Sequence, residues 1–171
     1  MPVEKIDTLV VGGGQAGIAM SEHLSVNGVP HLVLERNRVA ERWRTARWDS
    51  LVTNGPAWHD RFPGLTFGDV DKSVGPDDFP LKDTVADYLV AYAKKIAAPV
   101  RCGVEVLKVE RKVGQRGFRI ETSVGAIEAG AASSIVSAAS ECPPSRYRPR
   151  IGAGIKEPCP RGILPLTGER R

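Results

Sequence analysis

A short glycine-rich segment at residues 12–17 has the clearest chemical signature in the sequence. It places Gly12, Gly14 and Gly17 directly after an apolar run at 6–11. In this spacing the first glycine permits a tight turn, the second lets the backbone approach a pyrophosphate, and the third lets a helix pack closely on a strand. The N–H groups at the start of such a helix attract a diphosphate. The segment therefore predicts a turn that binds a dinucleotide.

Glu35 completes this pattern at the end of a second apolar run, 31–35. It lies 18 residues after Gly17, at a place where a carboxylate can accept hydrogen bonds from ribose hydroxyls. Gln15 and Ala16 supply the first N–H groups of the intervening helix. Because strand, glycine turn, helix, strand and acid follow in order, the sequence predicts a dinucleotide site of a type that FAD and NAD share.

The segment 36–64 favours one of these two cofactors. It is broken by Gly-Pro and Pro-Gly pairs and contains Trp43, Trp48, Trp58 and six arginines. An NAD dehydrogenase would continue promptly into another helix and strand, whereas long irregular segments in compact domains are usually functional. Arginines compensate phosphate charge and tryptophan rings suit a flat isoalloxazine, so the segment favours FAD. Core tryptophans and solvated arginines remain the alternative for each residue.

Apolar periodicity predicts the elements that position these residues. We expect strands at 6–11, 31–35, 104–112, 118–122 and 126–129, a helical turn at 39–44, and helices at 15–24 and 83–96. The first helix should bury Ala16, Met20 and Leu24 and stop at Gly28. Asp83 should cap the second helix, whose buried face would hold Val85, Leu89, Tyr92, Ala93 and Ile96. The predicted fold class is α/β, a Rossmann-like parallel sheet with a small antiparallel meander.

The character of the sequence changes at residue 129. Nine of the twelve residues 129–140 are Ala or Ser, and Pro, Gly and Arg without a period follow them. Only Ile135 and Val136 offer the start of another strand. A segment of this composition cannot bury an apolar face. We therefore expect a domain at 1–128 and a tail of low order at 129–171, and we hypothesise that the chain is truncated or altered in reading frame.

Composition and charge exclude several classes of function. The 171 residues are 42% hydrophobic and 26% charged, as in ordinary globular proteins. An apolar run long enough to cross a bilayer and a signal-peptide pattern are both missing, so we expect a cytoplasmic protein without a membrane partner. The net charge of +4 arises at 144–171, a segment poor in aromatic residues, so nucleic acid is not an expected partner. Three cysteines without C-x-x-C spacing favour neither a metal site nor a disulfide reductase.

The order of these motifs resembles that of the flavin-containing monooxygenases, within the flavoproteins that carry two dinucleotide-binding domains. VVGGGQAG at 10–17 and VLER at 33–36 are similar to the family's FAD-binding start. ERWR at 41–44 resembles its tryptophan segment beside the flavin, and WDSLVTNGP at 48–56 resembles the stretch that carries a Thr-Asn pair. Further similar stretches are FPG at 62–64, DFP at 78–80, the helix at 85–93 and VEV at 104–106. The resemblance covers roughly residues 5–128.

This resemblance implies roles for individual residues. The residues assigned to FAD binding are Gly12, Gly14, Gln15, Ala16, Gly17, Glu35, Arg36, Arg42, Trp43 and Val106. The glycines would hold the diphosphate, Glu35 the adenosine ribose, and the main chain of Val106 the adenine. Asn54 would be the catalytic residue, with its amide at the reactive edge of the flavin, because an amide donates hydrogen bonds without delivering a proton. Asn-Gly is also a strong turn signal, so a structural role for Asn54 remains open.

The sequence departs from the family in three ways. The second glycine fingerprint, for NADPH, is missing, because prolines follow its nearest likeness at 151–154. The F-x-G-x-x-x-H signature is absent, and the return strand is at best 135–140. We expect the FAD-binding part of an NAD(P)H-dependent flavin monooxygenase-like oxidoreductase for an unidentified small-molecule substrate, inactive by itself. The alternatives are a noncatalytic or degenerate FAD-binding fragment and an NAD(P)-binding Rossmann dehydrogenase.

Overall fold

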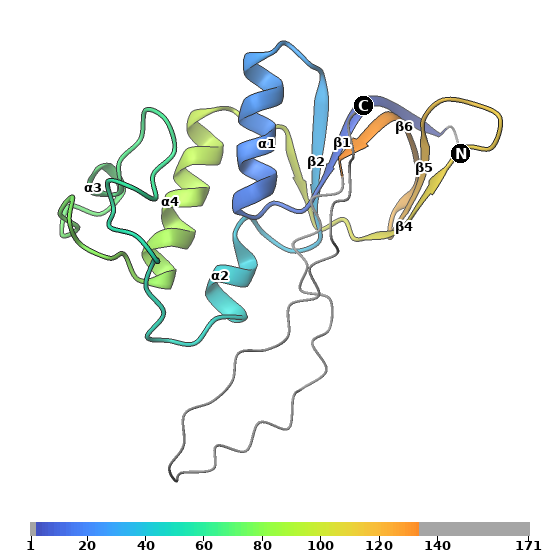
Figure 1. Cartoon of the computed structure of the whole chain (residues 1–171). Coiled ribbons are helices and arrows are strands. Elements are labelled where there is room, and N and C mark those ends of the chain that lie inside the picture. Colours follow the sequence, from blue (N-terminus) through green and yellow to red (C-terminus); the bar gives the residue numbers. More distant parts are fainter. Residues whose placement is uncertain (1–2, 134–171) are drawn as a thin grey trace, which may run out of the picture. The chain divides into compact units, whose positions relative to one another are not determined.

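A computed structural model of the chain describes residues 3–133, which form a six-stranded sheet with helices beside it (Figure 1). The strand order is β3-β2-β1-β6-β5-β4. The strands are β1 (Glu4–Val11), β2 (His31–Glu35), β3 (Val100–Cys102), β4 (Val106–Arg111), β5 (Phe118–Thr122) and β6 (Gly125–Ser133). Parallel and antiparallel strands share this one sheet, which confirms the predicted fold class.

The first half of the sheet is parallel. β1 pairs with β2 and with β6, and β2 pairs with β3, which the sequence analysis missed. Parallel neighbours need a crossover, and α1 (Gln15–Val26) provides it between β1 and β2. Between β2 and β3 lie α2 (Glu41–Thr45), α3 (Phe67–Val70) and α4 (Lys82–Lys95). Figure 1 shows α1 and α4 side by side, with α1 next to β2. Because β1 and β2 are parallel neighbours, their carboxyl ends lie at the same edge of the sheet, where α1 starts.

The antiparallel meander predicted for the second half is present in β4, β5 and β6. β4 begins at Val106, two residues later than expected. β6 continues to Ser133, beyond the predicted end at 129. The reason is that β6 also pairs with β1, where Ile6 lies opposite Ala129 and Val10 opposite Ser133. Main-chain hydrogen bonds keep this small-residue stretch extended, and an apolar side-chain pattern is not needed for that.

The buried face of α1 differs from the prediction. Gly17, Ile18 and Ser21 are buried, whereas Ala16 is exposed and Met20 is only half-buried. The helix has this rotation because Gly17 must approach the glycine turn closely. The spacing of the larger apolar residues therefore identified a helix correctly and its inner face incorrectly.

The start of α4 also differs from the prediction. Leu81 is the N-cap and Asp83 lies inside the first turn, where its negative charge favours the helix dipole without capping it. The predicted inner face is confirmed at its centre, since Val85, Leu89 and Tyr92 are buried. Tyr88 and Ala86 are buried as well, while Ile96 at the end of the helix is half-buried.

Aromatic packing on α4 fixes the irregular segment that follows α2. Phe67 stacks on Tyr88 with 4.1 Å between ring centroids, and Phe62 lies 4.7 Å from Tyr92. Aromatic pairs at these distances contribute packing energy beyond the area they bury. The segment 57–70 is therefore held on the helix although it contains little regular structure. The predicted helical turn near 39–44 corresponds to α2.

Several sequence expectations concern residues outside 3–133. They are the part of the predicted tail (129–171) that follows residue 133, the return strand at 135–140 and the NADPH-like stretch at 151–154. The structure does not describe these residues, whereas residues 129–133 of that predicted tail belong to β6. Among the residues that it does describe, no helix is long and apolar enough to cross a membrane.

Candidate functional site

The glycine turn joins β1 to α1 with very little space inside it. Gly12 has φ of 98°, a value that favours glycine, and its N–H donates to the carbonyl of Leu34 at 2.7 Å. A Cβ on Gly17 would lie 1.9 Å from the carbonyl oxygen of Gly12. Gly17 is thus required for the close approach of helix and strand.

Gly14, in contrast to Gly17, borders open space. It is the N-cap of α1 in an extended conformation, and no side chain caps the helix. A Cβ at Gly14 would meet no atom within 4 Å. The turn therefore leaves open space where the first N–H groups of α1 point, and this combination favours an anion.

Glu35 lies across this turn at the end of β2. Its Oε2 accepts the N–H of Gly13 at 2.7 Å, and its Oε1 accepts the N–H of Asn37 at 3.0 Å. A carboxylate has about four acceptor positions, so these two bonds fix its direction and leave capacity for a ligand hydroxyl. Glu35 thus lies at the edge of the open space beside Gly14.

One cavity of about 720 Å³ brings together every residue that the sequence analysis assigned to cofactor binding. Its lining includes Gly12, Gly14, Gln15, Ala16, Gly17, Glu35, Arg36, Arg42, Trp43 and Val106. These residues come from the glycine turn, the start of α1, the end of β2 and the residue after it, α2 and the start of β4, so a single hollow collects residues almost a hundred positions apart. Its volume is in the range of small-molecule and cofactor sites.

The same cavity contains residues that the sequence analysis did not select. Arg47, Phe62 and Glu105 line it. Glu105 lies 3.7 Å from Arg36, Oε1 to Nη1, so the charge of Arg36 is already partly compensated. Among residues 3–133 neither Arg42 nor Arg47 forms an ion pair within 4.0 Å. The number of arginines in the sequence could not show which of them is paired, because Glu105, the partner of Arg36, lies far along the chain, just before β4.

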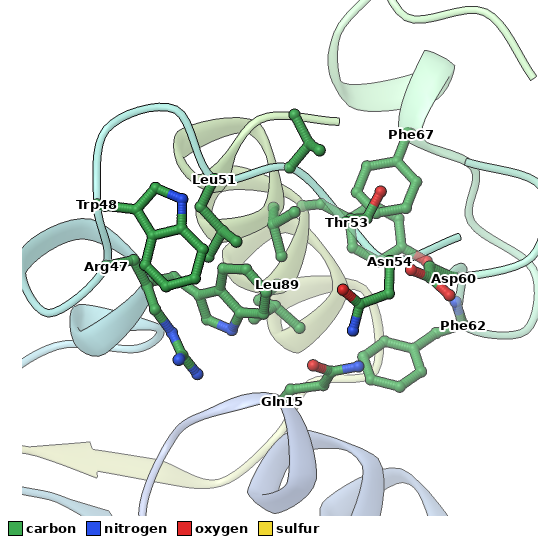
Figure 2. A pocket seen from close by; sticks show the side chains of 14 residues that line it. Gln15, Arg47, Trp48, Leu51, Thr53, Asn54, Asp60, Phe62, Phe67 and Leu89 are labelled. Carbon is green, nitrogen blue, oxygen red and sulfur yellow. Dashed lines mark hydrogen bonds between the residues drawn. The ribbon is translucent and has the colours of Figure 1, made fainter. Parts of the chain in front are cut away.

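A second cavity of about 440 Å³ adjoins the first (Figure 2). The two share Gln15, Trp43, Arg47 and Phe62 in their linings, so they meet at this point. The guanidinium of Arg47 lies 5.4 Å from the ring centroid of Trp43, a cation–π contact that keeps both side chains at the junction. The remaining lining is largely apolar: Trp48, Leu51, Val52, Phe67, Val85, Tyr88 and Leu89.

Asn54 lies in the second cavity, away from the glycine turn. Figure 2 shows its amide directed toward the amide of Gln15, which belongs to the first turn of α1. Asn54 sits in a bend, as Asn-Gly predicts, but within the described chain its side chain forms no hydrogen bond. The bend is held by Thr53, whose hydroxyl donates to the carbonyl of Gly55 at 2.7 Å. Asn54 therefore occupies a turn and leaves its amide free for a ligand.

Two other polar side chains have structural bonds. The Tyr88 hydroxyl accepts the N–H of Phe62 at 2.6 Å and donates to the carbonyl of Leu65 at 3.0 Å, and burial raises the pKa of Tyr88. Both ring nitrogens of His31 are occupied, by Ser21 at 2.8 Å and by the carbonyl of Val29 at 2.9 Å. Within residues 3–133, no group of three or more His, Cys, Asp or Glu side chains could hold a metal ion.

Parts of known proteins are similar to this chain in sequence. Residues 9–139 match the protein family described as pyridine nucleotide-disulphide oxidoreductase. An uncharacterized CzcO-like oxidoreductase of Geobacillus kaustophilus (strain HTA426) is 35% identical over 122 residues, which cover 70% of this chain and 32% of the relative. The probable indole-3-pyruvate monooxygenase YUCCA1 of Arabidopsis thaliana is 29% identical over 115 residues, which cover 67% of this chain and 27% of that protein.

Solved structures share the fold as well. A flavin monooxygenase from Stenotrophomonas maltophilia, solved as a double mutant, superposes with a TM-score of 0.64 and 28% identity, over 77% of this chain and 38% of the other. The predicted resemblance to flavin-containing monooxygenases is confirmed by these matches. The chain spans about a third of the length of the curated relatives it matches.

Proposed function

Since the chain belongs to the pyridine nucleotide-disulphide oxidoreductase family, we propose that residues 3–133 bind FAD as part of a flavin monooxygenase-like oxidoreductase. One observation carries this proposal: two adjoining cavities run from the open glycine turn at Gly14 to the free amide of Asn54. A dinucleotide has a charged middle and a flat aromatic end. The first cavity suits the charged middle, and the second suits the flat end.

The residues present fit FAD. The open position beside Gly14, at the uncapped start of α1, accommodates a diphosphate, and Glu35 at the cavity edge retains acceptor capacity for ribose hydroxyls. Arg42 and Arg47 supply positive charge toward the diphosphate, and the main chain of Val106 borders the space left for adenine. When bound, FAD would supply the redox chemistry, and the protein would provide orientation and electrostatics.

Asn54 and Gln15 are the polar groups that would meet the flat end of FAD. Their amides face each other across the junction of the cavities (Figure 2). An amide can donate and accept hydrogen bonds, but it neither titrates nor transfers a proton at neutral pH. Apolar side chains such as Leu51, Phe67 and Leu89 line that end, although Asn54 itself is exposed. Asn54 thus orients groups at the reactive end without acting as an acid.

NAD(P)H is our proposal for the electron donor of the whole protein, since the family description includes a pyridine nucleotide. A small molecule is the proposed substrate, in the cytoplasm, with neither nucleic acid nor a membrane as partner. A second candidate is a FAD-binding chain without turnover. One observation favours it: the two cavities of residues 3–133 account for FAD alone.

Absorption spectroscopy of the purified chain tests the proposal. We expect a flavin spectrum after addition of FAD, release of FAD on heating, and competition between ADP and FAD for the glycine turn. NADPH added under air then separates the two candidates: consumption above that of free FAD supports the oxidoreductase, and stable NADPH supports binding without turnover. Binding of NAD(P)⁺ without any binding of FAD would contradict both and indicate a dehydrogenase-type site.

A further inference from the structure

The bend that carries Asn54 is fixed at both main-chain polar groups of the next residue, Gly55. Thr53, which is buried, donates its hydroxyl to the carbonyl of Gly55 at 2.7 Å. Asp60 accepts the N–H of Gly55 with its Oδ2 at 3.1 Å. Both main-chain polar groups of Gly55 are therefore bonded to side chains. The peptide between Asn54 and Gly55 therefore cannot rotate without breaking the bond to Asp60, and Thr53 holds the peptide after it.

Asp60 is itself held in place. Its N–H donates to the carbonyl of Pro56 at 3.2 Å, and its Oδ1 lies 2.7 Å from Nδ1 of His59. Gly55 packs tightly against this pair, since a Cβ there would lie 2.8 Å from Nδ1 of His59 and 2.9 Å from Oδ1 of Asp60. The carboxylate of Asp60 is therefore held in place, and it can in turn hold the N–H of Gly55.

The contrast lies in the side chain of Asn54. Its backbone is constrained, yet within the part of the chain that the structure describes its amide forms no hydrogen bond and points into the cavity toward Gln15 (Figure 2). A free polar group on a constrained backbone meets a ligand from one direction. Asp60 lines the same cavity, so the carboxylate that holds Gly55 lies close to the Asn54 amide that it would direct.

We propose that Asp60 is a positioning residue that, by accepting the N–H of Gly55, sets the direction in which the amide of Asn54 enters the cavity. This inference rests on the proposed function, because the ligand group that Asn54 would meet is the isoalloxazine of FAD. ADP lacks that group and can occupy only the cavity at the glycine turn. Asp60 therefore affects the binding of FAD and leaves the binding of ADP unchanged.

The test uses the full 171-residue chain and measures dissociation constants for FAD and for ADP, together with the visible spectrum of bound FAD. Asp60→Ala should weaken FAD binding about tenfold and leave ADP binding within about twofold, the size expected from one hydrogen bond to a charged group. Its spectral change should match that of Asn54→Ala. The double variant should be no weaker than Asn54→Ala alone, because both substitutions act through the same amide.

Two further variants separate positioning from general stability. Asp60→Asn keeps an acceptor oxygen and should retain most of the FAD affinity. Asp78→Ala is the matched control: Asp78 accepts the N–H of Gly75 at 2.7 Å in the same manner, and neither residue lines either of the two cavities described. Asp78→Ala should therefore bind FAD like the parent chain. If Asp60→Ala does not fold, Thr53→Val removes the other bond to Gly55 and should show the same selective loss.

Several outcomes would overturn the inference: equal loss of FAD and ADP binding in Asp60→Ala, an unchanged flavin spectrum in that variant, or the same loss in Asp78→Ala. A parent chain that binds neither ligand refutes the proposed function instead. In that case ¹H–¹⁵N spectra of the ligand-free chain test whether Asp60 positions Asn54. The resonances of the Gly55 N–H and the Asn54 side-chain amide should move in Asp60→Ala and not in Asp78→Ala, and unmoved resonances refute positioning.

Discussion

The two walls of the candidate site are held together by different forces. The wall formed by β1, α1 and β2 depends on main-chain contacts, such as the N–H of Gly12 on the carbonyl of Leu34 at 2.7 Å. The wall formed by the segment 36–81 depends on side chains that reach its main chain from α4. Tyr88 bonds to Phe62 and Leu65, and Lys82 donates to the carbonyl of Arg44 at 3.1 Å.

Because of this difference, the two walls should be sensitive to different kinds of substitution. In the glycine turn of the first wall the important positions lack a side chain, so any added atom either clashes or fills the ligand space. In the second wall the important positions carry a hydroxyl, an ammonium or a carboxylate, so loss of one group leaves a main-chain partner unpaired. The first wall should therefore respond to added volume and the second to removed bonds.

Gly17→Ala should have the largest effect, because it breaks the first wall. The new Cβ would lie 1.9 Å from the carbonyl oxygen of Gly12, a main-chain atom that cannot move without disturbing the pairing of β1. We expect the free energy of unfolding to fall by about 3 kcal/mol or more, the upper range for overpacking. Urea unfolding measures this. Stability equal to that of the parent chain would show that helix and strand are not packed as described.

Gly14→Ala sharpens the comparison within the same turn. Its Cβ meets no protein atom within 4 Å, so the free energy of unfolding should change by less than about 0.5 kcal/mol. The added methyl group instead occupies the space proposed for the diphosphate, so binding of FAD and of ADP should each weaken about tenfold or more, equivalent to about 1.4 kcal/mol. Isothermal titration with both ligands tests this, and unchanged affinity for both would contradict the diphosphate site.

Tyr88→Phe breaks the second wall while keeping its volume. The variant leaves the N–H of Phe62 and the carbonyl of Leu65 without their partner, at a cost of about 1–3 kcal/mol. Burial raises the pKa of Tyr88, so the hydroxyl stays protonated around neutral pH and the loss should be the same at pH 6 and pH 8, roughly one unit to either side of neutrality. Thermal unfolding at both values is the measurement. ADP binding, which depends on the first wall, should not change.

Glu4→Gln should have the smallest effect. Glu4 and Arg101 form a bidentate pair at 2.7 and 2.8 Å on the partly exposed edge of the parallel strands, and exposed pairs contribute less than about 1 kcal/mol. The hydrogen bond from Arg101 lowers the pKa of Glu4, so the contribution is present above the ordinary carboxyl range and is lost as the pH falls through the lowered pKa. Parent and variant should differ slightly in unfolding free energy at neutral pH and converge in acid.

Sequence-based prediction succeeded where structure follows from neighbouring residues. The strand, glycine turn and helix at 6–24 depend on local spacing, and Glu35 lies where its distance from Gly17 predicted. It failed where pairing with a distant segment of the chain determines the structure. β3 is three residues long and exists because β2 offers it an edge, and β6 extends to Ser133 because β1 pairs with it.

The candidate site shows the same division. All ten residues assigned to cofactor binding line one cavity, since most of them belong to the turn, the helix start and the strand end that local spacing predicts. Arg47 and Phe62 were not selected, because their position at the junction depends on packing against Trp43 and Tyr92. The constraint of Asn54 by Asp60 was likewise not predicted, since side-chain direction within an irregular loop leaves no periodic signal.

The sequence by itself determined the β1–α1–β2 unit and the chemistry of its turn, because glycine spacing and apolar runs act over a few residues. Tertiary structure decided which cavity arginines form no ion pair within residues 3–133, which face of α1 is buried, and that the hollow at the glycine turn continues to Asn54. These properties depend on contacts between segments far apart in the chain, whose energies no single segment contains.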